Sequence, residues 1–162
     1  MATASILFGS NMGNKDFIFA ESCRHIINRC GVLKGMSSAY VSEPWGFEAD
    51  EWFLNRLVVI DTELVPDELV RRLLDIEVDM GRVRHPETKG YTSRPIDLDL
   101  LYYDSQVLQT EWVTLPHPRL HLRRFTLLPL CELMPDFIHP VLQQSQTELL
   151  ACCPDNAEVR KL

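Results

Sequence analysis

The 162-residue sequence lacks the features that mark membrane-spanning, secreted and disulfide-rich chains. No apolar run approaches the roughly 20 residues that are needed to cross a bilayer. The N-terminus shows no basic segment followed by a long apolar one, which a secretory signal would have. The five cysteines are odd in number and irregular in spacing, so they do not suggest a disulfide framework. We therefore expect a cytoplasmic protein with reduced thiols and no membrane association.

Repeats, low-complexity tracts and linkers are also missing, as are two common phosphate-binding signatures. The motif G-x-x-x-x-G-K-[ST] does not occur, and the early segment 9–13 lacks the G-x-G-x-x-G spacing. A net charge of −7 argues against a general nucleic-acid binder. With 46% hydrophobic residues, the chain predicts one domain over residues 1–162.

Basic residues are nonetheless concentrated in two short segments. Residues 81–94 contain five basic side chains against one acid, and residues 118–125 contain four basic side chains and no acid. Such clusters in an acidic chain indicate a confined site for a small polyanion, although two solvated basic loops would give the same pattern.

Hydrophobic periodicity predicts alternating strands and helices. In order, we expect a strand at 4–8, a helix between Asn14 and Gly31, a strand over 32–41 broken at Gly35, a strand at 53–62, a helix from Pro66 to Gly81 and a strand at 95–103. This β-α-β-β-α-β order predicts an α+β, ferredoxin-like core over about residues 4–104, with helices packed on a mainly antiparallel sheet.

Residues 105–162 are expected to form a C-terminal α/β extension of the same domain. A short strand pair is predicted near Val107 and Trp112, a helix near residues 123–133, and a helical tail from Gln143 onwards.

Asp97 and Asp99 are the sharpest feature of the sequence. Because side chains alternate along a strand, both carboxylates point to one face, with Cα atoms roughly 7 Å apart. They can hold one or two Mg²⁺ ions, which prefer oxygen ligands, although two exposed carboxylates on an open sheet would show the same pattern. Arg82, Arg84 and Arg94 lie nearby in the sequence. Since guanidinium groups match phosphate oxygens, the combination predicts a phosphate-and-magnesium site.

An aromatic group precedes an amide in the segment that leads into the 53–62 strand. Trp45, Phe47, Trp52 and Phe53 are followed by Asn55. Aromatic faces can hold a flat heterocycle while an amide reads its edge. The alternative is that Phe53 and one tryptophan are core residues and the others cover a loop.

A histidine lies close to several arginines in the third group. His117 lies within Leu-Pro-His-Pro-Arg at 115–119, which is followed by Arg123, Arg124 and Phe125. A lone histidine is more often structural than catalytic, but among arginines it can donate a hydrogen bond to a phosphate.

Together these segments resemble the hydroxymethyldihydropterin pyrophosphokinase family. The matching pieces occur in family order over residues 5 to about 135: GSNMGN at 9–14, PWG at 44–46, FLN at 53–55, IE at 76–77, GRVR at 81–84, SRPIDLDLLYYD at 93–104 and LPHPRLHLRRFTLLPL at 115–130. The resemblance implies transfer of a diphosphate from ATP to 6-hydroxymethyl-7,8-dihydropterin in folate biosynthesis.

The resemblance also implies a role for individual residues. Asp97 and Asp99 would hold two Mg²⁺ ions that bridge the ATP phosphates. Arg82 and Arg94, on a mobile loop, would move in and neutralise charge during transfer. The other implied contacts are Arg84, Thr114, His117 and Arg123 with ATP, and Ser42, Trp45, Phe53, Asn55, Phe125 and Asp97 with the pterin.

The sequence departs from the family pattern at a few positions. Pro118 replaces a frequent tyrosine, Trp112 stands where some members have an ATP-contacting arginine, and the segment between Arg84 and Arg94 is two residues longer than in some members. These departures concern adenosine binding.

We expect a monomer acting on small molecules, with no nucleic acid or membrane as partner. The competing interpretation is a non-catalytic, ferredoxin-like ligand-binding or regulatory module, which leaves the convergence of acidic and basic residues without a role.

Overall fold

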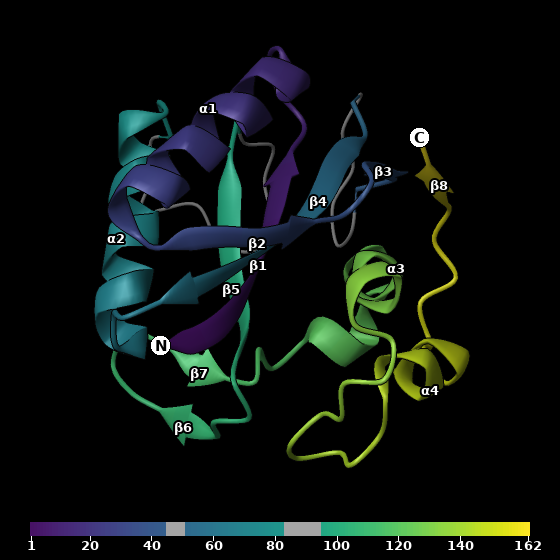
Figure 1. Ribbon diagram of the computed structural model, residues 1–162. Coiled ribbons are helices and arrows are strands. Elements are labelled where there is room, and N and C mark those ends of the chain that lie inside the picture. Colours follow the sequence, from purple (N-terminus) through teal and green to yellow (C-terminus); the bar gives the residue numbers. More distant parts are fainter. Residues whose placement is uncertain (45–50, 83–94) are drawn as a thin grey trace.

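A computed structural model describes residues 1–44, 51–82 and 95–162 of the chain (Figure 1). One antiparallel sheet lies between two layers of helices. Helices α1 (Lys15–Arg29) and α2 (Pro66–Asp79) cover one face, and α3 (Arg124–Leu133) and α4 (Gln146–Ala151) lie against the other. Among the residues that the structure describes, no helix is long and apolar enough to cross a membrane.

The main sheet has the strand order β5-β1-β4-β3-β8, and β2 also pairs with β4. Every pairing in it is antiparallel. The strands are β1 (Ala2–Ser10), β2 (Val32–Met36), β3 (Tyr40–Ser42), β4 (Phe53–Thr62), β5 (Asp97–Tyr103) and β8 (Val159–Lys161). The fold is therefore a mixed α and β structure, as expected, with β1 and β4 at its centre.

The two long helices begin and end as the sequence predicts. The Asn14 side chain caps α1 by accepting a hydrogen bond from the Phe17 amide at 3.1 Å. Pro66 occupies the first turn of α2, where its missing N–H costs no helical hydrogen bond. Gly81, at φ +95°, then ends α2 in a backbone conformation that other residues rarely adopt.

Gly31 follows α1 as predicted, but for a different physical reason. Its φ is not in the left-handed region, and a Cβ atom placed on it would lie 2.2 Å from the Asp61 carbonyl oxygen. The residue is small because β4 passes against the end of α1. The expected strand at 32–41 is also broken, but between β2 and β3 at residues 37–39, with a register shift between Leu33 and Gly35.

The C-terminal part contains the elements that were expected and two that were not, η1 and β8. A two-stranded sheet, β6 (Leu108–Gln109) with β7 (Thr114–Leu115), precedes the 3₁₀ helix η1 (Leu120–Leu122) and α3. The helical tail is short, because α4 covers only 146–151, and the chain then adds β8 to the outer edge of β3.

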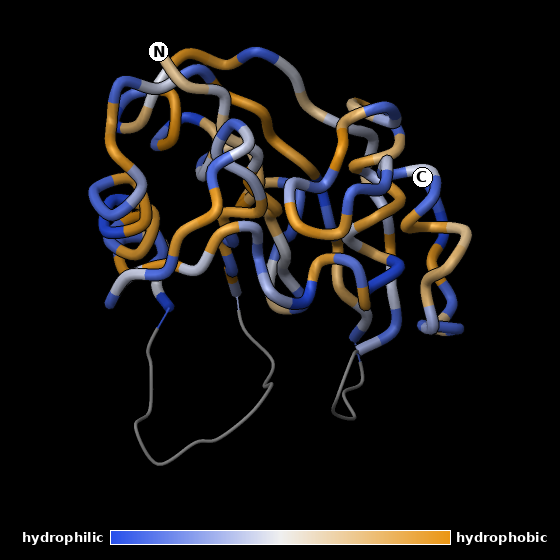
Figure 2. Tube along the Cα trace, turned by 90° about the horizontal axis from the view of Figure 1, so that it is seen from below, coloured by the Kyte–Doolittle hydropathy of each residue, from blue (hydrophilic) through white to orange (hydrophobic). Residues whose placement is uncertain are grey.

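Two apolar clusters fill the space on either side of the sheet. Along β1 and β4, alternate residues face α1 and α2 or face α3, so most residues of both strands are buried. Figure 2 shows hydrophobic and hydrophilic stretches following one another along the chain. On β5 the alternation is interrupted. The pairing with β1 shifts register between Ser5 and Ile6, so Leu101 and Tyr102 both pack on the α3 side. Before that shift, Leu98 and Leu100 face α2, and Asp97 and Asp99 face the other way.

Candidate active site

The two aspartates lie on one face of β5, at the edge of the sheet and on the side of α3. Their side chains are 21% and 29% exposed, so both carboxylates are accessible while their backbone is held in the β1–β5 ladder. This placement agrees with the strand alternation expected for the D-x-D pattern.

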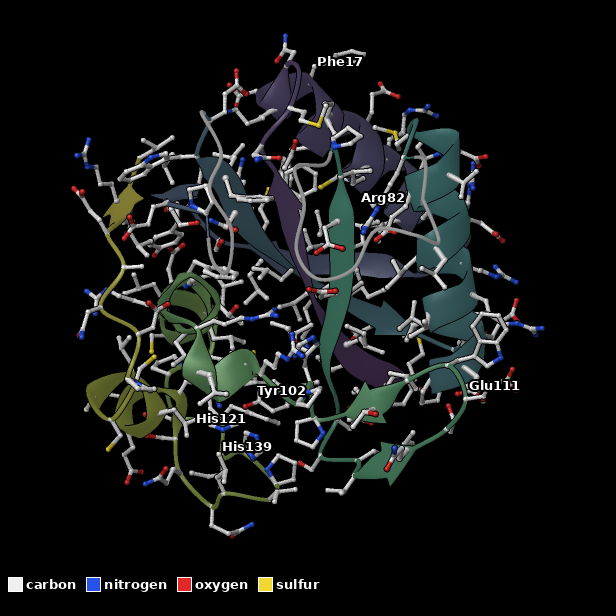
Figure 3. All side chains as sticks on the ribbon, turned by 180° about the vertical axis from the view of Figure 1, so that it is seen from behind. Phe17, Arg82, Tyr102, Glu111, His121 and His139 are labelled. Carbon is white, nitrogen blue, oxygen red and sulfur yellow. The ribbon has the colours of Figure 1, made fainter. Side chains whose placement is uncertain are left out.

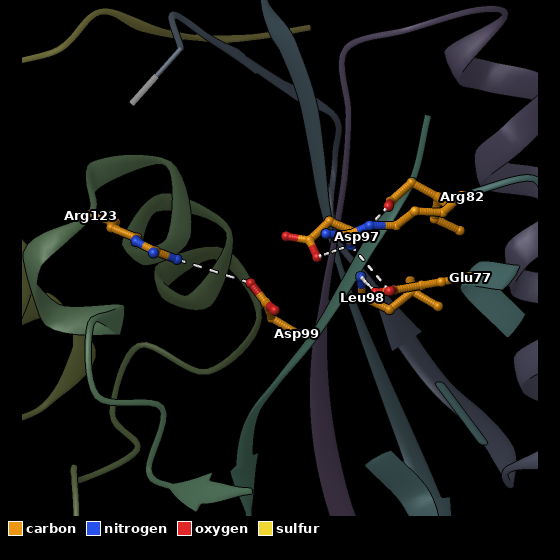
Figure 4. A network of polar contacts seen from close by, with 7 residues as sticks. Glu77, Arg82, Asp97, Leu98, Asp99 and Arg123 are labelled. Atoms are coloured by element: carbon orange, nitrogen blue, oxygen red, sulfur yellow. Dashed lines mark hydrogen bonds and ion pairs between the residues drawn. The ribbon is translucent and has the colours of Figure 1, made fainter. Parts of the chain in front are cut away.

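Arg82 binds directly to one of these carboxylates (Figure 4). Its Nη1 atom donates to Asp97 Oδ1 at 2.8 Å, to Glu77 Oε1 at 3.1 Å and to the Ile96 carbonyl at 3.2 Å. Glu77 is only 2% exposed, and its second oxygen accepts from the Leu98 amide at 2.8 Å. A buried carboxylate on α2 thus holds both Leu98, the second residue of β5, and the arginine that neutralises Asp97.

Arg123 approaches the second carboxylate from the start of α3. Its Nη1 lies 4.0 Å from Asp99 Oδ2, and the residue is 6% exposed. Burial lowers the pKa of the Arg123 guanidinium, while Asp99 and Asp97 raise it. Asp97 and Asp99 therefore lie between two cations, Arg82 and Arg123, which come before and after them in the sequence, as Figure 4 shows.

His117 lies close to these groups and is neutral at physiological pH. Burial, followed by the positive charge of Arg123, lowers the pKa of His117 to about 4, although Asp97 raises it. Its Nδ1 atom accepts a hydrogen bond from the Arg119 amide at 3.1 Å. Because a neutral imidazole has one N–H, the proton is on Nε2, which makes Nε2 a hydrogen-bond donor.

A cavity of about 310 Å³ adjoins the aspartates. Its walls come from α2, from β5 and from the chain at 112–118. Val70, Leu73 and Leu74 give it an apolar side, and Thr114 and His117 give it a polar one. Trp112 and Pro118, the two departures from the family pattern, both line it.

Phe53, Asn55 and Ser42 form a second region on the same face of the sheet, beyond β1. The Asn55 Nδ2 group donates to Ser42 Oγ at 2.8 Å and to the Tyr40 carbonyl at 3.2 Å, and all three side chains of this region are buried. The amide is thus oriented by β3, which fixes the direction of its oxygen.

Gly9 of β1 separates this region from the aspartates. In the sheet register Gly9 lies opposite Asn55 on one side and opposite Asp97 on the other, so the two regions are about 10 Å apart across two strand spacings. A Cβ on Gly9 would stand 3.7 Å from Asn55 Oδ1 and 3.9 Å from a Phe53 ring carbon. The strand therefore provides a floor without side chains between the amide and the carboxylates.

The structure brings together most of the residues that the sequence singled out. Phe125 lies at the start of α3, with the Arg123 guanidinium 5.7 Å from its ring centre, on the face that also carries the aspartates and Phe53. Trp45, Arg84 and Arg94 lie outside the described residues. Two other histidines are remote: His121 and His139 cluster near Tyr102, away from Arg82 (Figure 3).

Two residues of the site were assigned no role from the sequence. Glu77 follows Leu73 by one helical turn and therefore lies on the apolar face of α2. A carboxylate at such a position indicates that the side chain has a buried polar partner. Gly9 had no comparable signal, since a glycine that ends an apolar run reads equally well as the start of a turn.

The family model described as 7,8-dihydro-6-hydroxymethylpterin-pyrophosphokinase (HPPK) matches residues 5–135. The 2-amino-4-hydroxy-6-hydroxymethyldihydropteridine pyrophosphokinase of Methylorubrum extorquens is 37% identical over 85% of this chain and 86% of its own length. The protein of the same name from Aquifex aeolicus is 33% identical over 91% and 90%. The folic acid synthesis protein fol1 of Schizosaccharomyces pombe is 38% identical over 93% of this chain, which matches only 20% of that protein.

Solved structures show the same fold at low sequence identity. An HPPK-DHPS in complex with substrates superposes with a TM-score of 0.73 at 13% identity, over 93% of this chain and 43% of the other. The wild-type HPPK-DHPS of Plasmodium falciparum with pteroate gives a TM-score of 0.72 at 14% identity, over 93% and 44%. This chain thus spans less than half of those solved chains. The sequence matches show that the chain belongs to the 7,8-dihydro-6-hydroxymethylpterin-pyrophosphokinase family.

Proposed function

We propose that the protein transfers a diphosphate from ATP to 6-hydroxymethyl-7,8-dihydropterin, producing AMP and the pterin diphosphate for folate biosynthesis. The observation that carries this proposal is the position of Asp97 and Asp99. They lie between Arg82 and Arg123, beside a cavity on one side and the Asn55 amide on the other. That arrangement offers a place for a charged phosphate chain between two binding regions.

The cavity suits the nucleotide end of ATP. Its apolar wall on α2 and β5 can cover a flat base, and Thr114 and His117 offer polar groups next to the aspartates. The neutral His117 ring can donate from Nε2 to a phosphate oxygen, and Arg123 adds a fixed positive charge. Arg84, outside the described residues, is proposed as a further phosphate ligand.

The region around Asn55 suits the pterin. Because Ser42 and Tyr40 hold the amide nitrogen, its oxygen has one direction in which to accept a hydrogen bond from a ring edge. Phe53 and Phe125 are proposed to cover the two faces of the ring, with Trp45 completing the region. Across Gly9, the hydroxymethyl group would then point towards Asp97.

The aspartate pair fits Mg²⁺. Two carboxylates on one face of one strand, both partly exposed, provide oxygen ligands at an accessible edge. Asp97 and Asp99 would supply protein oxygen ligands, and water and phosphate oxygens would complete the coordination. When bound, two Mg²⁺ ions would supply positive charge to the ATP phosphates.

The reaction requires positioning and charge neutralisation more than it requires a strong base. The hydroxymethyl oxygen attacks the β-phosphorus of ATP and loses its proton to water, while the bond between the β-phosphorus and the bridging oxygen breaks and that oxygen leaves with AMP. In this structure Arg82 neutralises Asp97. Arg82 can turn towards the phosphates once other cations neutralise Asp97 in its place. Arg94 is proposed to act with it.

Finer features of the fold and state are also proposals. The order β5-β1-β4, with β2 and β3 on the far side of β4, supports the ferredoxin-like β-α-β-β-α-β description. A monomeric state and a cytoplasmic location are proposed with it, on the basis of the expectations from the sequence.

The direct test mixes the purified protein with ATP, Mg²⁺ and 6-hydroxymethyl-7,8-dihydropterin and follows AMP by chromatography. AMP should form only when pterin and metal are both present, so EDTA and pterin-free samples are the controls. In Asp99→Asn the rate should fall by about 100-fold or more, because a metal-ligating charge is removed. The matched control is Asp104→Asn, at the residue that follows the far end of β5.

Each negative outcome has its own meaning. A full-rate Asp99→Asn enzyme would contradict the assigned metal site. A folded wild-type protein that binds ATP only with Mg²⁺ but forms no AMP would point to another diphosphate acceptor. Absence of any ATP binding would instead favour the non-catalytic module.

A further inference from the structure

The C-terminal strand β8 forms the outer edge of the main sheet, next to β3 (Figure 1). In the register, Val159 lies opposite Ser42 and Lys161 opposite Tyr40. Further bonds extend this pairing at both ends: the Glu43 amide donates to the Glu158 carbonyl at 3.3 Å, and the Leu162 amide to the Ala39 carbonyl at 2.9 Å. A strand of only three residues, β3, is thus held on both of its edges.

One carboxylate on α3 joins both strands to that helix. Glu132 Oε1 accepts from the Tyr40 hydroxyl at 2.7 Å, and Oε2 accepts from the Ser38 amide at 2.8 Å. The Lys161 ammonium lies 3.7 Å from Oε1. Burial raises the pKa of Glu132, but the hydrogen bonds from Tyr40 and Ser38 and the charge of Lys161 together lower it. The carboxylate is therefore ionised at neutral pH and holds three segments at once.

These contacts reach the proposed pterin region through direct neighbours. The Asn55 amide takes its orientation from Ser42 Oγ and the Tyr40 carbonyl, both on β3. Phe125 lies on the same helix as Glu132, two turns earlier. Arg160 of β8 places its guanidinium 5.5 Å from the ring centre of Trp52, the residue just before Phe53. A displacement of β3 would thus rotate the Asn55 amide and change the distance between that amide and α3.

We propose that β8 and the Tyr40–Glu132–Lys161 cluster act together as a C-terminal latch that positions the pterin-binding wall of the site. This inference rests on the proposed function and assigns a role to the end of the chain. The latch does not touch the substrate, so its members are positioning residues.

The sheet order predicts that the latch affects one substrate and spares the other. The cavity proposed for ATP adjoins β5, at the opposite edge of the sheet from β8. Four strand spacings, about 19 Å, separate these two strands. Loosening β3 should therefore weaken pterin binding while leaving ATP binding almost unchanged.

The test compares two variants of the full enzyme, Glu132→Ala and a chain that ends at Ala157. The truncation keeps Asp155, whose carboxylate accepts from the Arg124 amide, so α3, which Arg123 directly precedes, retains this hydrogen bond at its start. We expect KM for the pterin, and its Kd by calorimetry, to rise about tenfold, as for the loss of one well-placed hydrogen bond. In the same variants, KM for ATP should change by less than about twofold.

Two further variants separate positioning from general destabilisation. Tyr40→Phe removes one hydroxyl and keeps the ring, so it should fold normally and raise the pterin KM by a smaller factor. Glu148→Ala removes half of the capping box that Glu148 forms with Ser145 at the start of α4, outside the latch, so it should lower the melting temperature and leave both KM values unchanged.

The outcomes are distinguishable from a failure of the proposed function. If the wild type forms AMP and Glu132→Ala and the truncation keep the wild-type pterin Kd, the latch is wrong and the function stands. If both KM values rise together in proportion to lost stability, the segment is only structural and the latch is again overturned. A wild-type protein that binds ATP but no pterin contradicts both proposals.

Discussion

At the scale of single residues, Gly9 shows how the backbone itself can shape a site. It lies between Asn55 and Asp97 in the sheet, and a methyl group there would meet its neighbours at ordinary contact distances of 3.7 and 3.9 Å. We therefore predict that Gly9→Ala folds as well as the wild type. The methyl group would project into the space proposed for the pterin, so pterin Kd should rise about tenfold or more.

Calorimetric titration of Gly9→Ala and Gly9→Val with pterin checks this prediction, and the ATP Kd of the same proteins is the internal control. The effect should increase with side-chain size. A Gly9→Val protein that folds and binds pterin as tightly as the wild type would show that the floor of the site lies elsewhere.

His117 offers a prediction about pH, because the folded protein holds it neutral. Its pKa is about 4 in the folded chain, compared with 6.5 for an ordinary histidine. The unfolded chain therefore binds a proton at a higher pH than the folded one. The contribution of His117 to stability is intact above pH 6.5 and is lost progressively as pH falls towards 4.

Urea unfolding of the wild type and His117→Gln between pH 7 and 4 measures this contribution. The difference in unfolding free energy between the two should change by up to about 1.4 kcal/mol per pH unit within that window. The comparison with the variant is needed because burial and the neighbouring His121 also lower the pKa of His139. A difference that stays constant with pH would contradict a neutral, buried His117.

The sequence was sufficient for those site residues whose arrangement is local. Strand alternation alone places Asp97 and Asp99 on one face, and the structure agrees. Contacts between distant segments were less accessible. Nothing in the spacing of Arg82 shows that it binds Asp97 and Glu77, because that contact depends on how α2 packs against β5.

At the scale of elements, two glycines around β2 have opposite roles. A Cβ on Gly31 would lie 2.2 Å from the Asp61 carbonyl oxygen, whereas a Cβ on Gly35 would have no heavy atom within 4 Å. We predict that Gly31→Ala destabilises the protein by about 1–3 kcal/mol, since β4 must move away from the end of α1. Gly35→Ala should be neutral or slightly stabilising, because alanine reduces the freedom of the unfolded chain.

Chemical denaturation of the two alanine variants tests this difference. Equal stabilities would mean that β4 can shift without cost, and would contradict the close approach at Gly31. Activity should follow the same order only near the unfolding temperature, since neither glycine touches the site.

The helices and the long strands could be predicted because their signals are local: the Asn14 cap, Pro66 at the start of α2, and the run of apolar residues in β4. The short strands could not be. In β8, Val159–Lys161 has two charged residues out of three and no alternation, and it becomes a strand only because β3 presents an open edge. The prediction of a helical tail from Gln143 onwards was correct for α4 alone, and β8 lies within that tail.

At the scale of the whole molecule, the site brings together residues of α2, β5 and the start of α3, and the two helices lie on different sides of the sheet. Helix α2 contributes Glu77, β5 the aspartates, and α3 begins beside Arg123, so the groups come from both sides of the sheet edge. Within the described residues, Arg82 lies against Asp97 and Arg123 lies near Asp99. A ligand that contacts all three elements would resist their separation and so oppose global unfolding.

We therefore predict that ATP with Mg²⁺ raises the unfolding free energy, and that neither component does so fully alone. At a ligand concentration 100 times Kd, linkage gives about 2.7 kcal/mol. Thermal unfolding with ATP and Mg²⁺, with ATP and EDTA, and with Mg²⁺ alone provides the measurement. In Asp99→Asn, the stabilisation by ATP with Mg²⁺ should be largely lost. The unliganded variant should remain folded, because the Asp99 side chain is 29% exposed and its Oδ2 atom lies as far as 4.0 Å from Arg123 Nη1. Equal stabilisation by ATP in EDTA would mean that the nucleotide binds without metal, so that the arginines and not the aspartates hold its phosphates.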